Sequence, residues 1–166
     1  MKTILSILER KSDNMEIVGY TPERKQEFID LNTWWIERYF GQIEQADWDE
    51  FNHVDDEIAQ GGMIFFAVDD EGVALATCMA IARGNDEWEI AKLGSNPNRP
   101  YKGCGKAVFE ACVEWAEAHG ARRIYILTNS SLEAAIHIYE IHGFERIHPD
   151  DFGGYARGDY TLKKII

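Results

Sequence analysis

The order of apolar and polar residues in the first part of the chain predicts one strand followed by two helices. Residues 15–20 alternate well enough for a strand. Thr21 then provides an N-cap and Pro22 the first residue of a helix, because proline has no N–H to leave unpaired there. A second, acidic helical stretch is expected over 44–59. The first helix presents three large apolar residues on one face: Phe28, Leu31 and Trp35.

The middle of the chain predicts strands. Gly61 and Gly62 break the acidic helix, and two continuous apolar runs follow over 63–68 and 73–82. Each run ends in a cluster of polar residues and glycine. This pattern indicates a β-hairpin that leads through a second turn into a third strand over 88–95.

The last part of the chain alternates between helix and strand. The most regular helical pattern follows Gly105, and Gly120 stands where a left-handed C-terminal cap is expected. A short buried strand is predicted over 124–127. A further helix follows it, opened by a capping box at 130–133. The final strands are predicted over 144–147 and 155–162.

Together these elements predict an α/β fold with a mixed sheet and helices on both faces. The chain has 166 residues, and single domains most often have about 100–150 residues. We therefore expect one domain over 15–166, with 1–14 as an appended arm.

Charge and cysteine content narrow the classes of function. The chain has 17 basic and 29 acidic residues, a net charge of −12. This argues against a nucleic-acid partner, because such binding depends on Lys and Arg neutralising phosphates. Three cysteines without a CxxC motif favour a reducing compartment, so a cytoplasmic location is expected. No apolar run approaches the roughly 18 residues of a membrane span, and no membrane partner is expected.

One glycine-rich loop carries the candidate chemistry, between the strand over 88–95 and the helix that follows. In such a loop, backbone N–H groups and a helix N-terminus converge on one anion, as in pyrophosphate sites. Gly103 and Gly105 lack the Cβ atoms that would block close approach. Residues 93–109 include no acid, so an anionic ligand is expected there. The cations of this stretch are Arg99, Lys102 and Lys106.

Two other glycine-loop motifs do not fit this loop. The Walker A pattern requires Ser or Thr after Gly-Lys, and Ala107 follows Lys106. The Rossmann pattern requires a third glycine where Val108 stands. It also follows a first strand, whereas this loop lies in mid-chain after a hairpin.

The segment resembles motif A of the GNAT superfamily of N-acetyltransferases, whose loop has the pattern Gln/Arg-x-x-Gly-x-Gly/Ala. Its six positions are Pro-Tyr-Lys-Gly-Cys-Gly at 100–105, and the resemblance continues through 107–116. Residues 128–129 and 135–144 are similar to motif B of the superfamily. Both motifs at compatible spacing make the resemblance specific.

Two positions depart from the superfamily pattern. Pro100 stands where Gln or Arg is usual, and Ser95 where a β-branched apolar residue is commoner. Since proline has no N–H, the first departure is expected to weaken one contact to pyrophosphate.

The resemblance implies a GNAT-like fold, with a mostly antiparallel central sheet that is splayed at the strand receiving the cofactor. It implies acetyl-CoA as the cofactor, an amine as the acceptor and no metal. The backbone of Leu93, Gly94 and Ser95 would bind the pantetheine arm and polarise the thioester carbonyl. The remaining implied cofactor contacts are Tyr101, Lys102, Gly103, Cys104, Gly105, Lys106 and Asn129.

Two residues are candidates for proton transfer. Glu89 is the candidate base, direct or through a water, because strand alternation places it on one face with Leu93. It could instead be a solvated carboxylate or an ion-pair partner of Lys92. Tyr139 occupies the tyrosine position of motif B and is the candidate acid, unless it is only a core residue. Asn129 could cap the helix turn rather than bind cofactor.

The acidic stretch suggests the acceptor. Residues 42–60 contain seven acids and no base, and in the superfamily the helices after the first strand form a wall of the acceptor site. An acidic wall with aromatic neighbours would attract a cationic amine, although a solvated helix face is the alternative. Neutralising Asp47, Asp49 and Glu50 is then expected to raise KM. The full acidic set is Glu44, Asp47, Asp49, Glu50, Asp55, Asp56 and Glu57, and the aromatic neighbours are Trp34, Trp35, Tyr39 and Trp48.

The function expected from the sequence is acetyl transfer from acetyl-CoA to a primary amine of a small, cationic molecule. The alternative from a different class is a catalytically silent acyl-CoA-binding regulatory or partner-binding module of the same fold. The sequence leaves a homodimer open.

Overall fold

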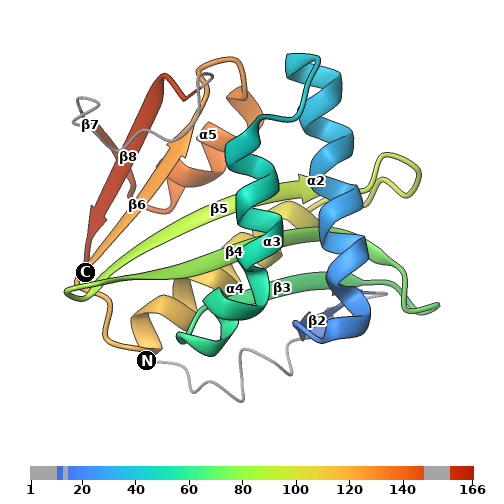
Figure 1. Ribbon diagram of the computed structural model, residues 1–166, viewed down its shortest axis with the longest axis horizontal. Coiled ribbons are helices and arrows are strands. Elements are labelled where there is room, and N and C mark those ends of the chain that lie inside the picture. Colours follow the sequence, from blue (N-terminus) through green and yellow to red (C-terminus); the bar gives the residue numbers. More distant parts are fainter. Residues whose placement is uncertain (1–10, 13–14, 148–157) are drawn as a thin grey trace.

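The computed structural model describes residues 11–12, 15–147 and 158–166 of the chain. Within these ranges it contains one mixed sheet, a short 3-10 turn and four α-helices (Figure 1). The strands are β1 (Lys11–Ser12), β2 (Met15–Gly19), β3 (Met63–Val68), β4 (Ala74–Gly84), β5 (Glu87–Ser95), β6 (Arg123–Thr128), β7 (Glu145–Ile147) and β8 (Tyr160–Ile165). The helical segments are η1 (Pro22–Arg24), α2 (Lys25–Phe40), α3 (Gln45–Ala59), α4 (Cys104–Ala118) and α5 (Glu133–Ile141).

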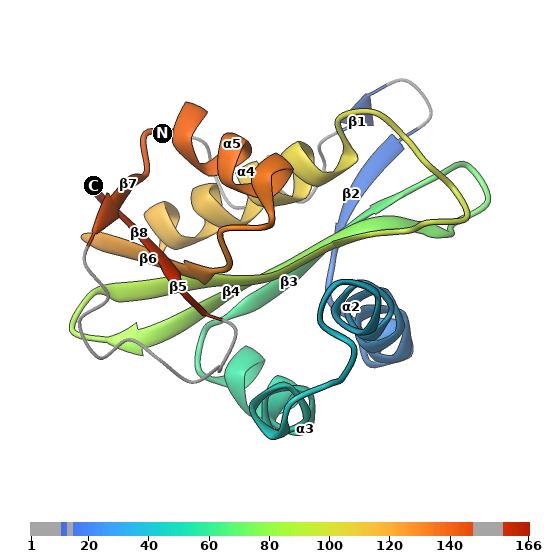
Figure 2. The ribbon, with the colours of Figure 1, turned by 90° about the horizontal axis from the view of Figure 1, so that it is seen from above.

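The strands of the described residues form a single sheet in the order β1-β2-β3-β4-β5-β6-β8-β7. Neighbouring strands are antiparallel except β5 and β6, which are parallel. Helices α2 and α3 cover one face of the sheet, and α4 and α5 cover the other (Figure 2). The predicted mixed, mostly antiparallel sheet with helices on both faces is therefore confirmed.

An apolar layer fills the space on each side of the sheet. Under α4 it includes Val108 and Phe109, and under α2 and α3 it includes Phe28 and Phe51, all of them at most 1% exposed. Each fully buried side chain of this size contributes about 1.5–3 kcal/mol relative to an exposed one. The chain leaves α4 as predicted, since Gly120 has a φ of +85°.

The first helix begins later than the sequence predicts. Pro22 opens the 3-10 turn η1, and α2 starts at Lys25. The backbone carbonyl of Thr21, not its side chain, accepts the N–H of Arg24 at 2.9 Å. A tight turn thus satisfies a donor that a side-chain N-cap would otherwise have to bind.

The capping box predicted at 130–133 is wrong, because both serines bond elsewhere. The Ser130 hydroxyl donates to Asp159 Oδ2 at 2.8 Å. The Ser131 hydroxyl donates to Asn129 Oδ1 at 2.6 Å. Helix α5 therefore begins without a side-chain cap.

Two predictions fall partly outside the described residues. Of the arm at 1–14, only Lys11–Ser12 is described, and it pairs antiparallel with β2. Of the strand predicted over 155–162, positions 155–157 lie outside the described residues. Strand β8 begins at Tyr160 and ends at Ile165, beyond the predicted end.

Candidate active site

The parallel strands β5 and β6 separate part-way along their length. Their residue pairs run only from Glu87 with Arg123 to Glu89 with Tyr125. Beyond that point β5 stays beside β4, while β6 stays beside β8 (Figure 1). The wedge between them holds a cavity of about 410 Å3, lined by residues of α2, β5, β6, α4 and α5. The predicted splay of the sheet at this strand is confirmed.

A β-bulge lies in the diverging half of β5. Thr77 of β4 pairs with Gly94, and Met79 pairs with Ala91, so β5 has one more residue in this interval than β4. Within the interval Lys92 has a φ of +57°, a backbone conformation that costs a non-glycine residue about 1–2 kcal/mol. A bulge of this kind bends the strand and places its extra residue outside the regular ladder.

The bulge also changes which side chains share a face, and the predicted common face of Glu89 and Leu93 is wrong. Leu93 packs against the apolar layer under α4. Glu89 lies on the α3 side, paired with Arg83, whose Nη1 is also 3.6 Å from Glu57 of α3. One additional residue is enough to invert the alternation of a strand.

Five of the predicted site residues line the main cavity, and Gly94 shows how closely α2 packs there. A Cβ on Gly94 would lie 2.9 Å from Cδ1 of Trp35. The Trp35 ring is held in place, since its Nε1 donates to Asn32 Oδ1 at 2.9 Å. The five predicted residues brought together are Leu93, Gly94, Ser95, Gly105 and Tyr139.

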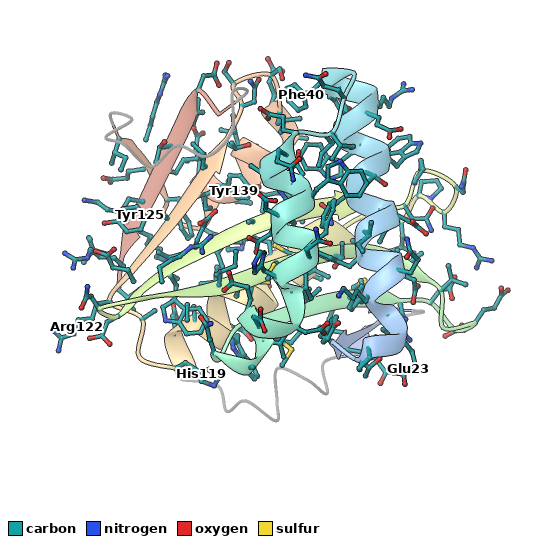
Figure 3. All side chains as sticks on the ribbon, in the orientation of Figure 1. Glu23, Phe40, His119, Arg122, Tyr125 and Tyr139 are labelled. Atoms are coloured by element: carbon teal, nitrogen blue, oxygen red, sulfur yellow. The ribbon has the colours of Figure 1, made fainter. Side chains whose placement is uncertain are left out.

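Tyr139 of α5 is both a core residue and a cavity residue. It is only 5% exposed, its ring centroid lies 5.1 Å from that of Phe109, and it lines the main cavity. Figure 3 marks the position of Tyr139. Burial raises the pKa of its phenol far above the usual value. A tyrosine in this state keeps its proton at neutral pH and can donate a hydrogen bond to an anion in the cavity.

A smaller cavity of about 50 Å3 adjoins the main one, and Glu89 and Asn129 line it. Its volume is enough for one or a few water molecules, since one water needs roughly 10–15 Å3 on this measure. Glu89 therefore lies beside the smaller cavity and does not line the main one. The residues shared by the two cavities are Trp35, Ala91, Lys92, Leu127, Thr128 and Leu132.

Glu89 and Asn129 have defined partners. Arg83 donates to Glu89 Oε1 from Nε at 3.0 Å and from Nη2 at 2.7 Å. Glu89 is 8% exposed, so it is not the solvated carboxylate considered above. Asn129 Oδ1 accepts the backbone N–H of Ser131 at 2.9 Å, so Asn129 does stabilise the turn before α5.

The glycine loop connects β5 to the first turn of α4. Asn96 anchors its start, with its backbone N–H donating to Leu75 at 2.8 Å. Gly103 has a φ of +85°, which glycine adopts without steric cost. A Cβ on Gly105 would make one ordinary contact, with Ser95 Oγ at 3.7 Å, and Gly105 lines the main cavity. With the unpaired N–H groups of a helix N-terminus, this loop fits a pyrophosphate.

The cations of the loop divide between structural and exposed positions. Arg99 binds the β3–β4 turn, with Nη1 2.5 Å from Asp69 and Nη2 3.1 Å from Glu71. Lys106 Nζ lies 3.8 Å from the carboxylate four residues further along α4. Lys102 is exposed. Arg99 therefore holds the loop in place, and the two lysines are the cations nearest to a ligand at the start of α4.

The side chain of Tyr101 is partly buried, and that of Cys104 is buried. Tyr101 packs against the apolar layer under α4. Cys104 is 5% exposed, and its thiol donates to the carbonyl of Leu75 at a sulfur–oxygen distance of 3.7 Å. Burial raises the pKa of this thiol. Both residues can therefore contribute backbone atoms to a cofactor site, while their side chains stabilise the loop.

The acidic helix α3 turns part of its charge inward. Asp47 is fully buried: Oδ2 accepts the N–H of Glu44 at 3.0 Å, and Oδ1 pairs with Lys92 at 2.8 Å. Burial, and then the charge of Glu57, raises the pKa of Glu50. Within the described part of the chain, Glu50 Oε1 is buried without a hydrogen-bond partner.

The predicted acidic wall does not reach the cavities. Among the described residues, neither Glu44, the N-cap of α3, nor any of the six acids within α3 lines either cavity. The aromatic prediction fares better, because Trp34, Trp35 and Tyr39 line the main cavity. Trp48 instead packs on Phe51, with ring centroids 5.7 Å apart.

Two residues at the cavities, Lys92 and Glu133, were not predicted as site residues. Lys92 borders both cavities, and Glu133 lines the main one. The partner of Lys92 is 45 positions away, a separation at which no sequence pattern signals an ion pair. Glu133 was considered only as part of a helix cap.

The family model of the acetyltransferase (GNAT) family matches residues 28–144. The chain belongs to this family. The structure is similar to that of a GNAT-family acetyltransferase from Staphylococcus aureus Mu50, with a TM-score of 0.80 and 17% identity over 91% of this chain and 98% of that one. It is also similar to that of an acetyltransferase from Streptococcus agalactiae 2603, with a TM-score of 0.78 and 20% identity over 93% of this chain and 100% of that one. No curated protein sequence matches the chain.

A third similar structure is PaiA N-acetyltransferase from Thermoplasma acidophilum, solved in complex with coenzyme A. Its TM-score is 0.72, with 14% identity over 93% of this chain and 100% of that one. At such identities the structural likeness establishes the fold, and the family model establishes membership. As a GNAT protein, the chain is an N-acetyltransferase with acetyl-CoA as its cofactor, as the sequence predicted. No helix in the described ranges is long and apolar enough to cross a membrane.

Proposed function

We propose that this GNAT protein transfers an acetyl group from acetyl-CoA to a primary amine of a small cationic molecule. The observation that carries the proposal is the pair of carboxylates beside the splayed strands, Glu133 at the main cavity and Glu89 at the smaller one. Trp34, Trp35 and Tyr39 line the same main cavity, and aromatic faces attract cations.

The interior between α3 and β5 supports the same preference. Its carboxylates outnumber its cations, and charges act more strongly there than in bulk water. Of the carboxylates, Glu89 lines the smaller cavity, where it favours a positively charged acceptor. The carboxylates are Asp47, Glu50, Glu57 and Glu89, and the cations are Arg83 and Lys92.

In the proposed reaction acetyl-CoA supplies the acetyl group as a thioester. The backbone of Leu93, Gly94 and Ser95 binds the pantetheine arm and polarises the carbonyl. Glu89 accepts the proton of the attacking amine through a water in the smaller cavity. The Tyr139 hydroxyl, which burial keeps protonated, would be the proton donor to the thiolate as the C–S bond breaks.

The remaining cofactor contacts are proposed at the glycine loop and the end of β6. Backbone N–H groups at the start of α4 bind pyrophosphate, with Lys102 and Lys106 adding positive charge. Asn129 borders the smaller cavity and is the proposed contact of the pantetheine arm there. The loop residues involved are Tyr101, Lys102, Gly103, Cys104, Gly105 and Lys106.

Two expectations about the cellular setting stay predictions. All three cysteines are free and buried, which accords with the cytoplasmic location expected from the absence of a pairing motif. A homodimer is left open.

A matched panel of amines tests the acceptor. Diamines and monoamines of equal chain length are compared as substrates, and we expect diamines to have the lower KM. Glu133→Gln should raise the KM of diamines about tenfold and leave that of monoamines unchanged. Glu23→Gln is the control, because Glu23 lies in η1, far from Phe40 at the other end of α2 (Figure 3), and lines neither cavity. Equal KM values for both amine series in the wild type would contradict the cationic acceptor.

A further inference from the structure

A buried ion pair joins the bulge of β5 to the start of α3. Lys92 Nζ lies 2.8 Å from Asp47 Oδ1, and the side chains are 3% and 0% exposed. The same ammonium lies 5.9 Å from the ring centroid of Phe51 on α3. Charges this deeply buried are retained only where a partner is held in good geometry, because desolvation of each ion is costly.

Each partner of this pair has a second task in the backbone. Lys92 is the residue with positive φ inside the bulge. Asp47 closes the capping box of α3, since its Oδ2 accepts the Glu44 N–H while Glu44 accepts from the N3 backbone. The strained residue of the strand is thereby tied to a fixed point on a neighbouring helix. Strained backbone conformations persist where surrounding contacts determine them in this way.

The tie lies directly beside the proposed thioester site. Lys92 borders both cavities, and the next residues, Leu93, Gly94 and Ser95, line the main one. A donor that stabilises a developing oxyanion has to be aimed before the reaction, and small misplacements of it are costly in rate. Whatever fixes the backbone at Lys92 therefore fixes the direction of the amides that follow.

We propose that the Lys92–Asp47 ion pair is a positioning device that holds the β5 bulge in the shape that polarises the thioester carbonyl of acetyl-CoA. The inference rests on the proposed role of the backbone of Leu93, Gly94 and Ser95. Lys92 and Asp47 act through that backbone and do not touch the reacting atoms. The start of α3 thus takes part in acyl transfer without lining the cavity.

The test compares the wild type with the double variant Lys92→Met/Asp47→Asn, which removes both charges and leaves no buried ion unpaired. The vibrational frequency of the thioester carbonyl is measured by infrared spectroscopy on bound acetyl-CoA carrying a 13C carbonyl. We expect the wild type to lower this frequency on binding, and the double variant to lose most of that shift. The variant's kcat should fall about tenfold to a hundredfold. Its Kd for acetyl-CoA should stay within about threefold, because the glycine loop is intact.

A second ion pair on the same strand provides the matched control. Glu87 and Arg123 pair at 3.2 Å at the end of β5 that stays beside β6. The variant Glu87→Gln/Arg123→Gln should keep the carbonyl shift and kcat. The single variant Lys92→Arg, which retains a cation at this position, should keep most of the shift in the carbonyl frequency. If the double variant does not fold by circular dichroism, Asp47→Glu displaces the pair by one methylene and should reduce the shift in proportion.

The outcomes separate this inference from the proposed function. A folded double variant that keeps both the shift and kcat overturns the inference. If the double variant loses both its affinity for acetyl-CoA and its kcat but keeps the carbonyl shift, the pair has a purely structural role. That result also overturns the inference. A wild type that binds acetyl-CoA without any carbonyl shift removes the proposed backbone role as well, whereas the amine panel tests the acceptor independently of either result.

Discussion

At the scale of single residues, two glycines of the site are required for different physical reasons. At Gly94 a Cβ would meet Cδ1 of Trp35 at 2.9 Å and the carbonyl oxygen of Leu31 at 3.3 Å, so the strand and α2 touch there. At Gly105 the nearest atom would be 3.7 Å away, which is an ordinary contact. The first glycine permits packing, and the second leaves room for a ligand.

Substitution of these glycines should separate stability from cofactor binding. Gly94→Ala forces Trp35 to move and should lower the free energy of unfolding by about 1–3 kcal/mol. Gly105→Ala lies in a helix and should leave the protein as stable or more stable by up to about 1 kcal/mol. It should nevertheless raise the Kd for acetyl-CoA, because its methyl group enters the loop space. Urea unfolding and calorimetric titration of both variants measure the two effects, and equal loss of stability in both would contradict this distinction.

The proposed acid of the reaction gives a second prediction at this scale. Tyr139→Phe removes only the hydroxyl from a buried ring, so the protein should fold and bind acetyl-CoA with unchanged Kd. Its kcat should fall about a hundredfold, in the range typical of general acids. Single-turnover acetyl transfer measures the effect. An unchanged kcat would leave Tyr139 with a packing role alone.

At the scale of elements, α3 carries acidic residues on two faces with different consequences. Asp55 points outward and accepts from Tyr20 at 2.6 Å and Lys25 at 3.0 Å. Glu50 and Glu57 turn toward β4 and β5, where burial raises the pKa of both carboxyls. The helix thus places ionisable groups in a setting that disfavours their charged form.

The raised pKa of Glu50 predicts a pH-dependent gain from Glu50→Gln. A carboxyl whose pKa is higher in the folded state stabilises the protein fully below its ordinary pKa of 4.5, and this contribution is lost as the pH rises through the folded value. Glu50→Gln should therefore raise Tm by about 2–4 °C near pH 8 and by much less near pH 4.5. Asp56→Asn on the exposed face is the control. A gain that is the same at both pH values would contradict the burial argument.

Elements of this fold with local sequence signals were predictable, and those that depend on distant contacts were not. The strands over 63–68 and 88–95, the helix after Gly103 and the loop between them were predictable because their signals are local: apolar runs, glycines and helical spacing. The capping box at 130–133 was mispredicted because Asp159, 29 positions from Ser130, competes for the serine hydroxyl. The local sequence around Ser130 carries no signal for a hydrogen-bond partner that far along the chain.

The site shows the same division between local and distant signals. The residues brought to the main cavity, such as Gly94 and Tyr139, belong to two motifs that each span a short segment. The face of Glu89 could not be derived by counting, because the bulge at Lys92 inverts the alternation. The Lys92–Asp47 pair depends on how α3 packs on the sheet, which no periodicity encodes.

At the scale of the whole molecule, acetyl-CoA should act as a stabilising ligand of the described domain. The proposed cofactor site is formed by elements from both sides of the splay, so it exists only in the folded protein. Binding of acetyl-CoA therefore favours the folded state. At about 100 times Kd a ligand adds roughly 2.7 kcal/mol, which for this size raises Tm by about 5–11 °C. Thermal unfolding with and without acetyl-CoA measures the shift. A folded protein that shows none would indicate that Pro100 has removed the pyrophosphate contact.

The three residue pairs that join β5 to β6 form a short seam between two unequal half-sheets. Strands β1 to β5 lie on one side of it, and β6, β8 and β7 on the other. Local opening of the sheet should begin where this seam meets the cofactor cavity, because no strand pairing among the described residues joins the two half-sheets beyond that point. We expect amide hydrogens of β6 near Ile126 to exchange faster than those of β4, and to slow when acetyl-CoA bridges the two halves. Bound acetyl-CoA would then hold the two half-sheets together in addition to supplying the acetyl group.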